Sequence, residues 1–454
     1  MSKGIAEYTP PLRLIIRISE GEDNIRREYP DIPVTQFGPN QICEVFDPTT
    51  NIVWGYVAID KLIRGDTSIG GCRLKEDLSV REVVSLAGDM TMKNAGSRLG
   101  VTGGKSGVKT NPDYFKMREG ETEDSTDYKK RKEEKKDLME KYAEAIAYLP
   151  SYTIAPDMGT DGTDMLNIYR WFEKIFGKNH SRGGTGREGG LDIDGWGSTA
   201  YGLLHAAQAI EKFFDWLHIE GARVVINGFG NVGGMAAKIF TEKGAKIIAV
   251  NDYHGVLHNK NGLDVNGLFS VIKHKDGIMA YEGEAIRYDA RESEGKEREN
   301  ILGELFKIPC DILIPAAVRD VIHEKNYKDI DAKIIIPGAN GPVAPEIENK
   351  LYDEKGIITL TDWIVNAGGV IAAYIEYEMD RNKSYAEIVT KADGTGREYV
   401  NDRIGNTISE NVTEIADRIA SSRKRGDSLY FRDAAVELAE GNLISPARIK
   451  DVRL

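Results

Sequence analysis

The chain has 454 residues, 41% of them hydrophobic and 29% charged, and a formal net charge of −12. This length exceeds what one hydrophobic core supports, so we expect a globular protein of two or three domains. The negative charge argues against a nucleic-acid partner, because phosphate binding needs a basic face and none stands out.

Three cysteines, Cys43, Cys72 and Cys310, lie far apart and form no C-x-x-C pair. A disulfide framework and a zinc site are both disfavoured, and we expect no metal. The first eleven residues are polar, and no run of eighteen apolar residues occurs, which argues against a signal peptide and a membrane span. We expect a soluble cytoplasmic protein with no membrane partner.

Residues 12–60 predict an early sheet. Three short runs, L-R-L-I-I-R-I, Q-I-C-E-V-F and I-V-W-G-Y-V-A-I, are separated by Pro, Asn and Asp turn signals. The segment Thr67–Arg73 then breaks the pattern with Gly70 and Gly71, which indicate backbone close to a ligand or to another strand. A simple turn is the alternative.

Two lysines lie twelve positions apart in the segment Met90–Pro112. Lys93 follows apolar residues at helical spacing, which predicts that it projects from the end of a helix. Lys105 follows two glycines, which predict a turn whose backbone can approach a ligand. One ammonium can bind a carboxylate, and the other, desolvated next to a like charge, would have its pKa lowered towards neutrality. Solvated loop lysines are the alternative.

The tract at residues 113–137 is dense in charge and reads as a solvated loop or helix face without an assigned function. A short strand then stops at Pro156 and presents Asp157 on the following turn. A turn aspartate of this kind is often only an Asx cap. The glycine-rich residues 177–197 predict a long loop or linker, after which a helix begins near Ser198 or Thr199.

Beyond this linker the segments alternate between strand and helix, as in a doubly wound parallel sheet. The clearest unit is R-V-V-I-N-G-F-G-N-V-G-G-M-A-A-K, followed by a second strand and Asp252. Gly228 permits the tight turn, Gly230 lets a pyrophosphate approach the backbone, and Gly233 lets helix and sheet pack. Asp252 is spaced to accept hydrogen bonds from a ribose 2′-hydroxyl and to repel a 2′-phosphate.

Two further strands end at Ala316 and Asn340, where sheets of this class bind ligands, so Asn340 is a candidate cofactor contact. Asn366 stands at the start of a long apolar helix, most of which we expect to be core. The terminal segment, with N-D-R-I-G-N-T-I-S-E-N-V-T-E-I-A-D-R-I and D-A-A-V-E-L-A-E, reads as amphipathic helix that packs back across both domains.

Together these residues resemble the glutamate/leucine/phenylalanine/valine dehydrogenase family of amino-acid dehydrogenases. The likeness extends from about residue 50 to the C-terminal helices. Seven motifs occur in the family's order: G-G-C-R at 70–73, M-T-M-K at 90–93, G-G-K ending at 105, A-P-D-M-G-T at 155–160, G-F-G-N-V-G at 228–233, P-G-A-N at 337–340 and N-A-G-G-V at 366–370.

The resemblance implies an activity and residue roles. Lys93 would bind the substrate α-carboxylate, Lys105 would be the catalytic lysine, and Asp157 its proton-relaying partner. NAD would take the Cα hydride of the amino acid and leave an iminium, to which a water activated by Lys105 adds, giving a 2-oxo acid and ammonia. Residues near the cofactor would be Thr199, Gly228, Gly230, Asn231, Val232, Gly233, Asp252, Ala316 and Asn340. Substrate residues beside Lys93 would be Ile69, Gly70, Asn366 and Ala373.

Two departures bear on the substrate. Glutamate-specific members carry a lysine where this chain has Ile69, and a hydroxyl where it has Ala373. An apolar wall rejects an unpaired carboxylate, because desolvating the charge costs several kcal/mol. T-A-Y-G and M-T-M-K-N-A also resemble the leucine and phenylalanine branch, whereas P-G-A-N-G-P and G-L-D-V-N-G-L resemble the glutamate branch.

We therefore expect NAD-dependent oxidative deamination of an L-amino acid with a non-acidic side chain, with NADP as a possible cofactor. The alternatives are a glutamate dehydrogenase with an atypical side-chain pocket and a dinucleotide-binding homologue with little activity. The expected fold is α/β: a substrate and oligomerisation domain with a mixed sheet at 1–197, a Rossmann-like domain at 198–364, a cleft between them, and a helical segment at 365–454. Family members are generally homo-oligomers, so we expect one here.

Overall fold

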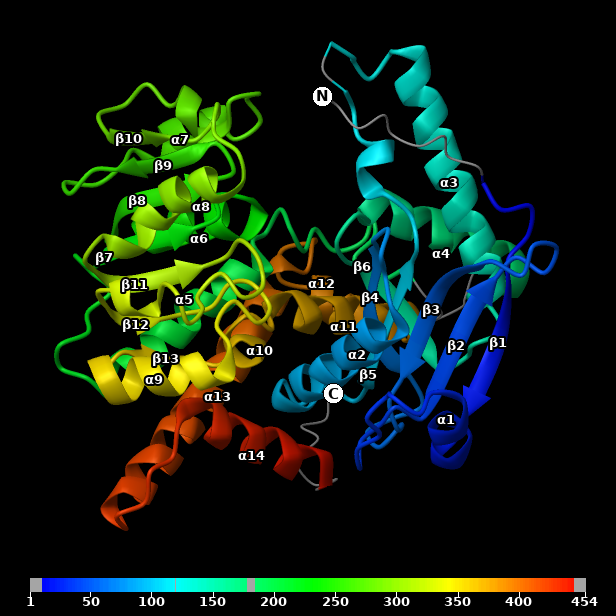
Figure 1. Ribbon diagram of the computed structural model, residues 1–454. Coiled ribbons are helices and arrows are strands. Elements are labelled where there is room, and N and C mark those ends of the chain that lie inside the picture. Colours follow the sequence, from blue (N-terminus) through cyan, green and yellow to red (C-terminus); the bar gives the residue numbers. More distant parts are fainter. Residues whose placement is uncertain (1–9, 119, 178–183, 445–454) are drawn as a thin grey trace. The chain divides into compact units, whose positions relative to one another are not determined.

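The structure is a computed structural model that describes residues 10–118, 120–177 and 184–444 (Figure 1). The chain divides into two compact units. The first runs to Asp192 and also takes Ala372–Arg397 and the chain from Asn442, and the second takes Ile193–Ile371 and Glu398–Gly441. The helical segment expected at 365–454 is thus divided between both units. Of the expected linker at 177–197, residues 178–183 lie outside the described residues.

The first unit is built on a six-stranded mixed sheet in the order β1-β2-β3-β5-β4-β6. The pairs from β1 to β5 are antiparallel, and β4 is parallel to both β5 and β6. The three early strands lie where the sequence predicts them. The strands are β1 (Ile15–Glu20), β2 (Gln41–Phe46), β3 (Val53–Ile59), β4 (Ser68–Leu74), β5 (Thr102–Val108) and β6 (Tyr152–Pro156).

Lys105 lies in strand β5, so the predicted glycine-rich turn around it is wrong. A Cβ on Gly103 would lie 2.2 Å from the backbone nitrogen of Thr91 in helix α2 (Val80–Gly96). The glycine therefore lets α2 pack directly on the strand rather than forming a turn. Close packing also explains a glycine of the pair in β4, since a Cβ on Gly70 would lie 1.6 Å from the carbonyl oxygen of Gly104 in β5. Of the alternatives for this segment, close approach to another strand is confirmed.

Helices cover both faces of this sheet. One face packs against α3 and α4, in a core that includes Leu138, Tyr142 and Ile168. The other face packs against α1 and α2, in a core that includes Ile25 and Val83. The second half of the charged tract 113–137 forms the start of α3. The helices of this unit, besides α2, are α1 (Glu22–Glu28), α3 (Thr126–Ile146), α4 (Gly162–Phe176) and α12 (Lys383–Thr390).

The second unit is built on a seven-stranded sheet in the order β10-β9-β8-β7-β11-β12-β13. Five strands, which are neighbours in the order β8, β7, β11, β12 and β13, run parallel, as the sequence predicts. Strand β9 is antiparallel to β8, because only Tyr253 and His254 separate them and a parallel crossover needs a dozen residues. Strand β10 pairs antiparallel with β9 at the edge of the sheet. The strands are β7 (Arg223–Asn227), β8 (Lys246–Asp252), β9 (Gly255–His258), β10 (Ile286–Asp289), β11 (Cys310–Pro315), β12 (Ala332–Ile335) and β13 (Ile358–Thr359).

This sheet is doubly wound. Val225 of β7 belongs to a core that includes Ile347 and Leu351 of α9, whereas its neighbour Ile226 faces Gly233 of α6. Alternate residues of one strand thus meet helices on opposite faces. The helices are α5 (Ser198–Glu211), α6 (Asn231–Glu242), α7 (Val265–Val271), α8 (Gly295–Gly303), α9 (Pro345–Lys355), α10 (Asp362–Val365), α13 (Arg397–Lys424) and α14 (Phe431–Ile444), and α11 (Gly368–Arg381) passes from this unit into the first.

Helix α5 begins at Ser198, which confirms the predicted start of a helix there. The long apolar segment after Asn366 is helix α11, as predicted. Among the described residues, no helix is both long and apolar enough to cross a membrane. All three cysteines are buried free thiols.

Candidate functional site

An ion pair between Lys105 and Asp157 is the centre of the candidate site in the first unit. The Nζ of Lys105 lies 2.9 Å from Oδ2 of Asp157, and both side chains are largely buried. Lys105 comes from β5, and Asp157 follows directly after the end of β6. Because β4 lies between these two parallel strands, the pair spans the carboxyl end of the sheet, where ligands bind in such folds.

Arg73 contacts the same carboxylate oxygen and was not predicted from the sequence. Its Nε lies 2.9 Å from Oδ2 of Asp157, and its Nη1 lies 2.8 Å from Glu82. Lys75 contacts Glu82 as well, at 2.8 Å. Arg73 ends the G-G-C-R motif, so its place in that motif was the available signal. Glu82 lies in the first turn of α2, and nothing in the sequence linked it to Asp157.

The two cations fix the ionisation of Asp157. Burial alone would raise the pKa of this carboxyl, but the charges of Lys105 and Arg73 and their hydrogen bonds outweigh burial and lower the pKa to about 2. Asp157 is therefore a carboxylate at neutral pH, able to accept protons and hydrogen bonds.

The proposed substrate residues of the first unit lie on elements next to this pair. Ile69 is 1% exposed and shares one face of β4 with Arg73, because side chains alternate along a strand. Gly70 points the other way, and its carbonyl accepts a hydrogen bond from the Tyr152 hydroxyl at 2.8 Å. Lys93 is buried in the last turn of α2, the helix that packs on β5.

Ala373 is buried in α11, within the first unit. Its carbonyl accepts a hydrogen bond of 2.6 Å from the Thr185 hydroxyl. This bond ties α11 to the segment that precedes α5. The side chain here is an apolar methyl group, at a position where the family resemblance implies a hydroxyl in glutamate-specific members.

The glycine loop of the second unit has the form expected of a dinucleotide site. Gly228 has a φ of +94°, the left-handed region that favours glycine. A Cβ on Gly233 would lie 1.8 Å from the carbonyl oxygen of Gly228, so this glycine is needed for helix packing. Gly230 has no heavy atom within 4 Å of a would-be Cβ. Helix α6 then begins with Asn231 and Val232, and its first amides have no side-chain cap.

The loops after β11 and β12, the start of α6 and the N-A-G-G motif lie next to one another beside this glycine loop. A Cβ on Gly338 would lie 3.0 Å from Ala316 and 3.1 Å from Val232. The Nδ2 of Asn366 donates to the carbonyl of Ala339 at 2.9 Å and to Oδ1 of Asn340 at 3.1 Å. The structure thus brings Ala316, Asn340 and Asn366 together in the second unit.

Thr199 joins this group through the start of α5. A Cβ on Gly369, in the N-A-G-G motif, would lie 3.2 Å from the Thr199 hydroxyl oxygen. The Oδ1 of Asn366 is buried without a hydrogen-bond partner among the described residues. A buried acceptor of this kind needs a donor from a ligand or water. Asn366, assigned to the substrate by resemblance, lies here beside the proposed cofactor residues.

Asp252 is the last residue of β8, at the position expected for a ribose-binding acid. Its carboxylate accepts the backbone amides of His254 at 2.7 Å and of Ile278 at 2.9 Å. The ring Nδ1 of His254 lies 3.3 Å from the same carboxylate. A carboxylate offers about four lone-pair positions, so at least one remains for a hydroxyl donor. The open space at Gly230, the uncapped start of α6 and this acid together fit a dinucleotide.

These features define an α/β protein with a doubly wound sheet of the dinucleotide-binding type. The family model of the glutamate/leucine/phenylalanine/valine dehydrogenases matches residues 189–440, and the model of their dimerisation domain matches residues 39–174. The chain belongs to this family.

Individual relatives agree with this assignment. An NADP-specific glutamate dehydrogenase of Saccharolobus shibatae is 34% identical over 75% of this chain and 73% of its own. An NAD-specific glutamate dehydrogenase of Staphylococcus aureus is 33% identical over 75% of each chain.

Solved structures share the fold. The hetero-hexameric glutamate dehydrogenase of Thermus thermophilus, in a leucine-bound form, has a TM-score of 0.68 at 22% identity, covering 95% of this chain and 88% of its own. The L-tryptophan dehydrogenase of Nostoc punctiforme has a TM-score of 0.58 at 18% identity, covering 90% of this chain and 96% of its own.

Proposed function

We propose that this protein catalyses the reversible oxidative deamination of an L-amino acid with a non-acidic side chain, using NAD and yielding a 2-oxo acid and ammonia. Family membership makes it an NAD(P)-dependent amino-acid dehydrogenase. The observation that carries the narrower proposal is buried Ile69, on the face of β4 shared with Arg73, where a glutamate enzyme of this family would place a lysine.

In the proposed mechanism Lys93 holds the substrate α-carboxylate as a point charge. Bound NAD supplies the hydride acceptor. When the hydride has left Cα with its electron pair, Lys105 passes its ammonium proton to Asp157 across their 2.9 Å contact and, as a neutral amine, removes a proton from a water whose oxygen adds to Cα. Asp157 gives its proton to the nitrogen, and its carboxylate then accepts the hydroxyl proton as the C–N bond breaks; this proton leaves with the ammonia. Proton transfer of this kind typically contributes about 10²–10⁴-fold to a rate.

Glutamate is the second candidate substrate, because the curated relatives that match this chain are named glutamate dehydrogenases. A panel of twenty L-amino acids with NAD decides between the candidates. We expect the highest kcat/KM for an aliphatic or aromatic amino acid. A glutamate rate far above the leucine, valine and phenylalanine rates would overturn the non-acidic proposal. Cofactor binding without turnover on any amino acid would favour the low-activity homologue.

Asp252 supports NAD as the preferred cofactor, because a second anion at the 2′ position would be repelled. Arg298 stacks 4.0 Å from the centre of the neighbouring Tyr253 ring, and this cation supports some use of NADP. Comparing kcat/KM for the two cofactors tests the preference, and a higher value with NADP would contradict it.

The use of Gly230 for cofactor binding is tested by Gly230→Ala. The fold has room for the methyl group, so we expect stability to be kept and NAD affinity to fall about tenfold or more. Gly303→Ala, at an equally open glycine of the same unit, is the control and should leave NAD affinity unchanged. Equal NAD affinity of both variants would show that no ligand approaches Gly230.

We also propose that the protein is a homo-oligomer assembled through the first unit, since the dimerisation-domain model matches residues 39–174. Analytical ultracentrifugation tests this proposal, and a monomer at micromolar concentration would contradict it. A cytoplasmic location remains a prediction supported by the free thiols of all three cysteines.

A further inference from the structure

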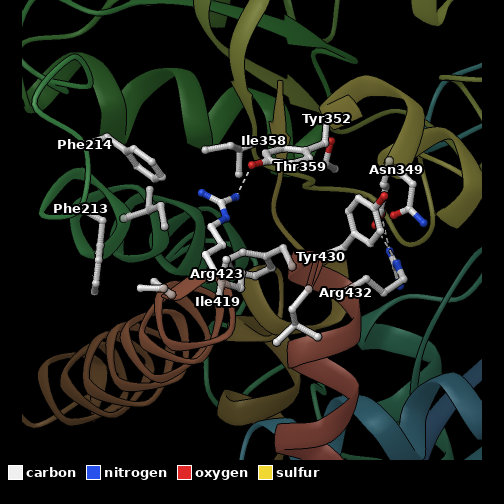
Figure 2. A pocket seen from close by; sticks show the side chains of 16 residues that line it. Phe213, Phe214, Asn349, Tyr352, Ile358, Thr359, Ile419, Arg423, Tyr430 and Arg432 are labelled. Carbon is white, nitrogen blue, oxygen red and sulfur yellow. Dashed lines mark hydrogen bonds and ion pairs between the residues drawn. The ribbon is translucent and has the colours of Figure 1, made fainter. Parts of the chain in front are cut away.

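The second unit contains a cavity that the proposed reaction does not use. It has a volume of about 200 Å³ and is lined by residues of α5, α9, β13, α13 and α14 and of the adjoining loops (Figure 2). A cavity of about 150 Å³ holds benzene, so this one has room for a single ring or branched chain with one polar group. The apolar lining residues are Ile210, Phe213, Phe214, Ile358, Ile419 and Phe431.

One arginine of the polar lining has no acidic partner among the described residues. Arg423 is exposed, and its guanidinium donates to the Tyr352 hydroxyl but forms no ion pair with any described residue (Figure 2). Arg432 is paired with Glu348, through bonds of 2.8 and 2.6 Å, and also with Asp362, so its charge is already balanced. Arg423 therefore supplies the cation on the cavity wall that favours an anionic ligand group.

A buried hydroxyl on the same wall has no partner. Thr359 is 5% exposed and lines the cavity, and its Oγ1 forms no hydrogen bond with the described residues. A buried unpaired hydroxyl destabilises the folded protein, and a ligand oxygen would relieve that cost. The unpaired hydroxyl and the unpaired arginine are independent observations that both indicate an acceptor-bearing ligand.

The cavity wall is also joined to the proposed cofactor residues. Arg432 lies 2.8 Å from Asp362, and the other oxygen of Asp362 accepts the backbone amide of Gly341 at 2.9 Å. Gly341 directly follows Asn340, which is bonded to Asn366. A ligand that attracts Arg432 therefore competes with its ion pair to Asp362, the residue that is hydrogen-bonded to the loop of Asn340.

We propose that this cavity is an effector site for a small monocarboxylate with an aromatic or branched body, linked through Arg432 to the loop of Asn340. The carboxylate binds Arg423 and the Thr359 hydroxyl, its charge also attracts Arg432 on the same cavity wall, and the apolar body packs against Phe213, Phe214 and Ile419.

Calorimetry with phenylacetate, in the absence of cofactor and amino acid, tests the binding. We expect saturable binding to the full-length protein and at least tenfold weaker binding of phenylacetamide, which has the same shape without the charge; a tenfold loss corresponds to about 1.4 kcal/mol. Arg423→Met should weaken phenylacetate at least tenfold, whereas Lys424→Met, which removes a charge from the next residue of α13, should change it less than twofold. No saturable binding, or equal effects of the two variants, would overturn the proposal.

Thr359→Val separates binding from folding. Valine removes an unpaired hydroxyl, so we expect the free energy of unfolding to be kept or raised while phenylacetate binds several-fold more weakly. Unchanged affinity in this variant would remove Thr359 from the site.

The linkage is measured as the NAD dissociation constant with and without saturating phenylacetate. We expect a change of about fivefold or more, with the reciprocal change in phenylacetate affinity when NAD is saturating. Equal affinities would overturn the linkage. Because binding is read by heat without turnover, these results stand apart from the proposed amino-acid dehydrogenase activity.

Discussion

Two buried carboxylates, one in each unit, are paired with arginine but ionise in opposite directions. In the first unit, Lys105 and Arg73 outweigh the effect of burial and lower the pKa of Asp157 to about 2. In the second unit, burial raises the pKa of Glu348 to about 7, although Arg432 bonds both of its oxygens.

The difference lies in how many acids share each cation. Asp157 receives two cations on one oxygen. Glu348 shares Arg432 with Asp362, and the charges of Asp362 and Asp433 add to the effect of burial. An arginine contact therefore does not by itself keep a buried acid ionised; the local sum of charges decides.

Among substitutions in the two clusters, removal of Lys105 is expected to have the largest effect, and this effect is on kcat. Lys105→Ala takes away the proposed base, so we expect kcat to fall by about 10²–10⁴-fold while NAD affinity is kept. Steady-state kinetics and calorimetry with NAD measure the two quantities. Lys109→Ala, just beyond the end of the same strand, is the control and should retain activity. Unchanged turnover in Lys105→Ala would refute the assigned role.

Removal of Arg432 tests the second cluster. Arg432→Met leaves Glu348 and Asp362 buried together without their cation, which costs about 3–5 kcal/mol of the free energy of unfolding. Urea unfolding followed by circular dichroism measures the loss. Arg418→Met, which breaks a more exposed ion pair with Glu414 at 2.8 Å in the same unit, should cost at most about 1 kcal/mol. Equal losses would show that burial of the cluster is unimportant.

Removal of Arg73 probes the cation that the sequence did not reveal. Arg73→Met leaves Asp157 with Lys105 alone, so the pKa of Asp157 should rise by about 1 unit or more. We expect the acid limb of kcat/KM against pH to move to higher pH in the deamination direction. Lys75→Met, which loses a contact with Glu82 but none with Asp157, should leave the limb in place. A lower stability with an unmoved limb would indicate a purely structural Arg73.

Much of the fold could be predicted from the sequence because its signals are local. The loop at Gly228–Gly233 and the strand before Asp157 depend on neighbours within a few residues, and both are found as predicted. Lys105 was placed in a turn because a glycine pair usually marks one. The segment is a strand instead, and its glycines leave room for α2 to pack on it. No local sequence pattern records that packing.

The electrostatics of the site could not be predicted in the same way. Arg73 and Asp157 are 84 positions apart, and so are Glu348 and Arg432. The pKa of a carboxyl depends on how many such distant charges lie close to it, and no local sequence pattern records that number. Resemblance to the family implies functional roles for Lys105 and Asp157, and it places Arg73 in a shared motif without connecting Arg73 to the carboxylate of Asp157.

The smallest expected effect is on the pH dependence of stability, where the two carboxylates should differ in sign. The folded pKa of Glu348, about 7, lies above its ordinary value of 4.5. As pH rises from about 4.5 to about 7, the folded state holds a proton that the unfolded state has released, and ionising the buried group then lowers stability.

Glutamine imitates the protonated form at every pH. The free energy of unfolding of the wild type, relative to Glu348→Gln, should therefore be similar near pH 5 and fall by up to a few kcal/mol by about pH 8. Asp157, whose folded pKa of about 2 lies below its ordinary 3.8, should behave in the opposite way. Relative to Asp157→Asn, the wild type should keep its advantage above about pH 4 and lose it as pH falls towards about 2. Urea unfolding of the three proteins across this range provides the measurement. Parallel curves for both variants would mean that the two clusters do not differ in charge as the structure indicates.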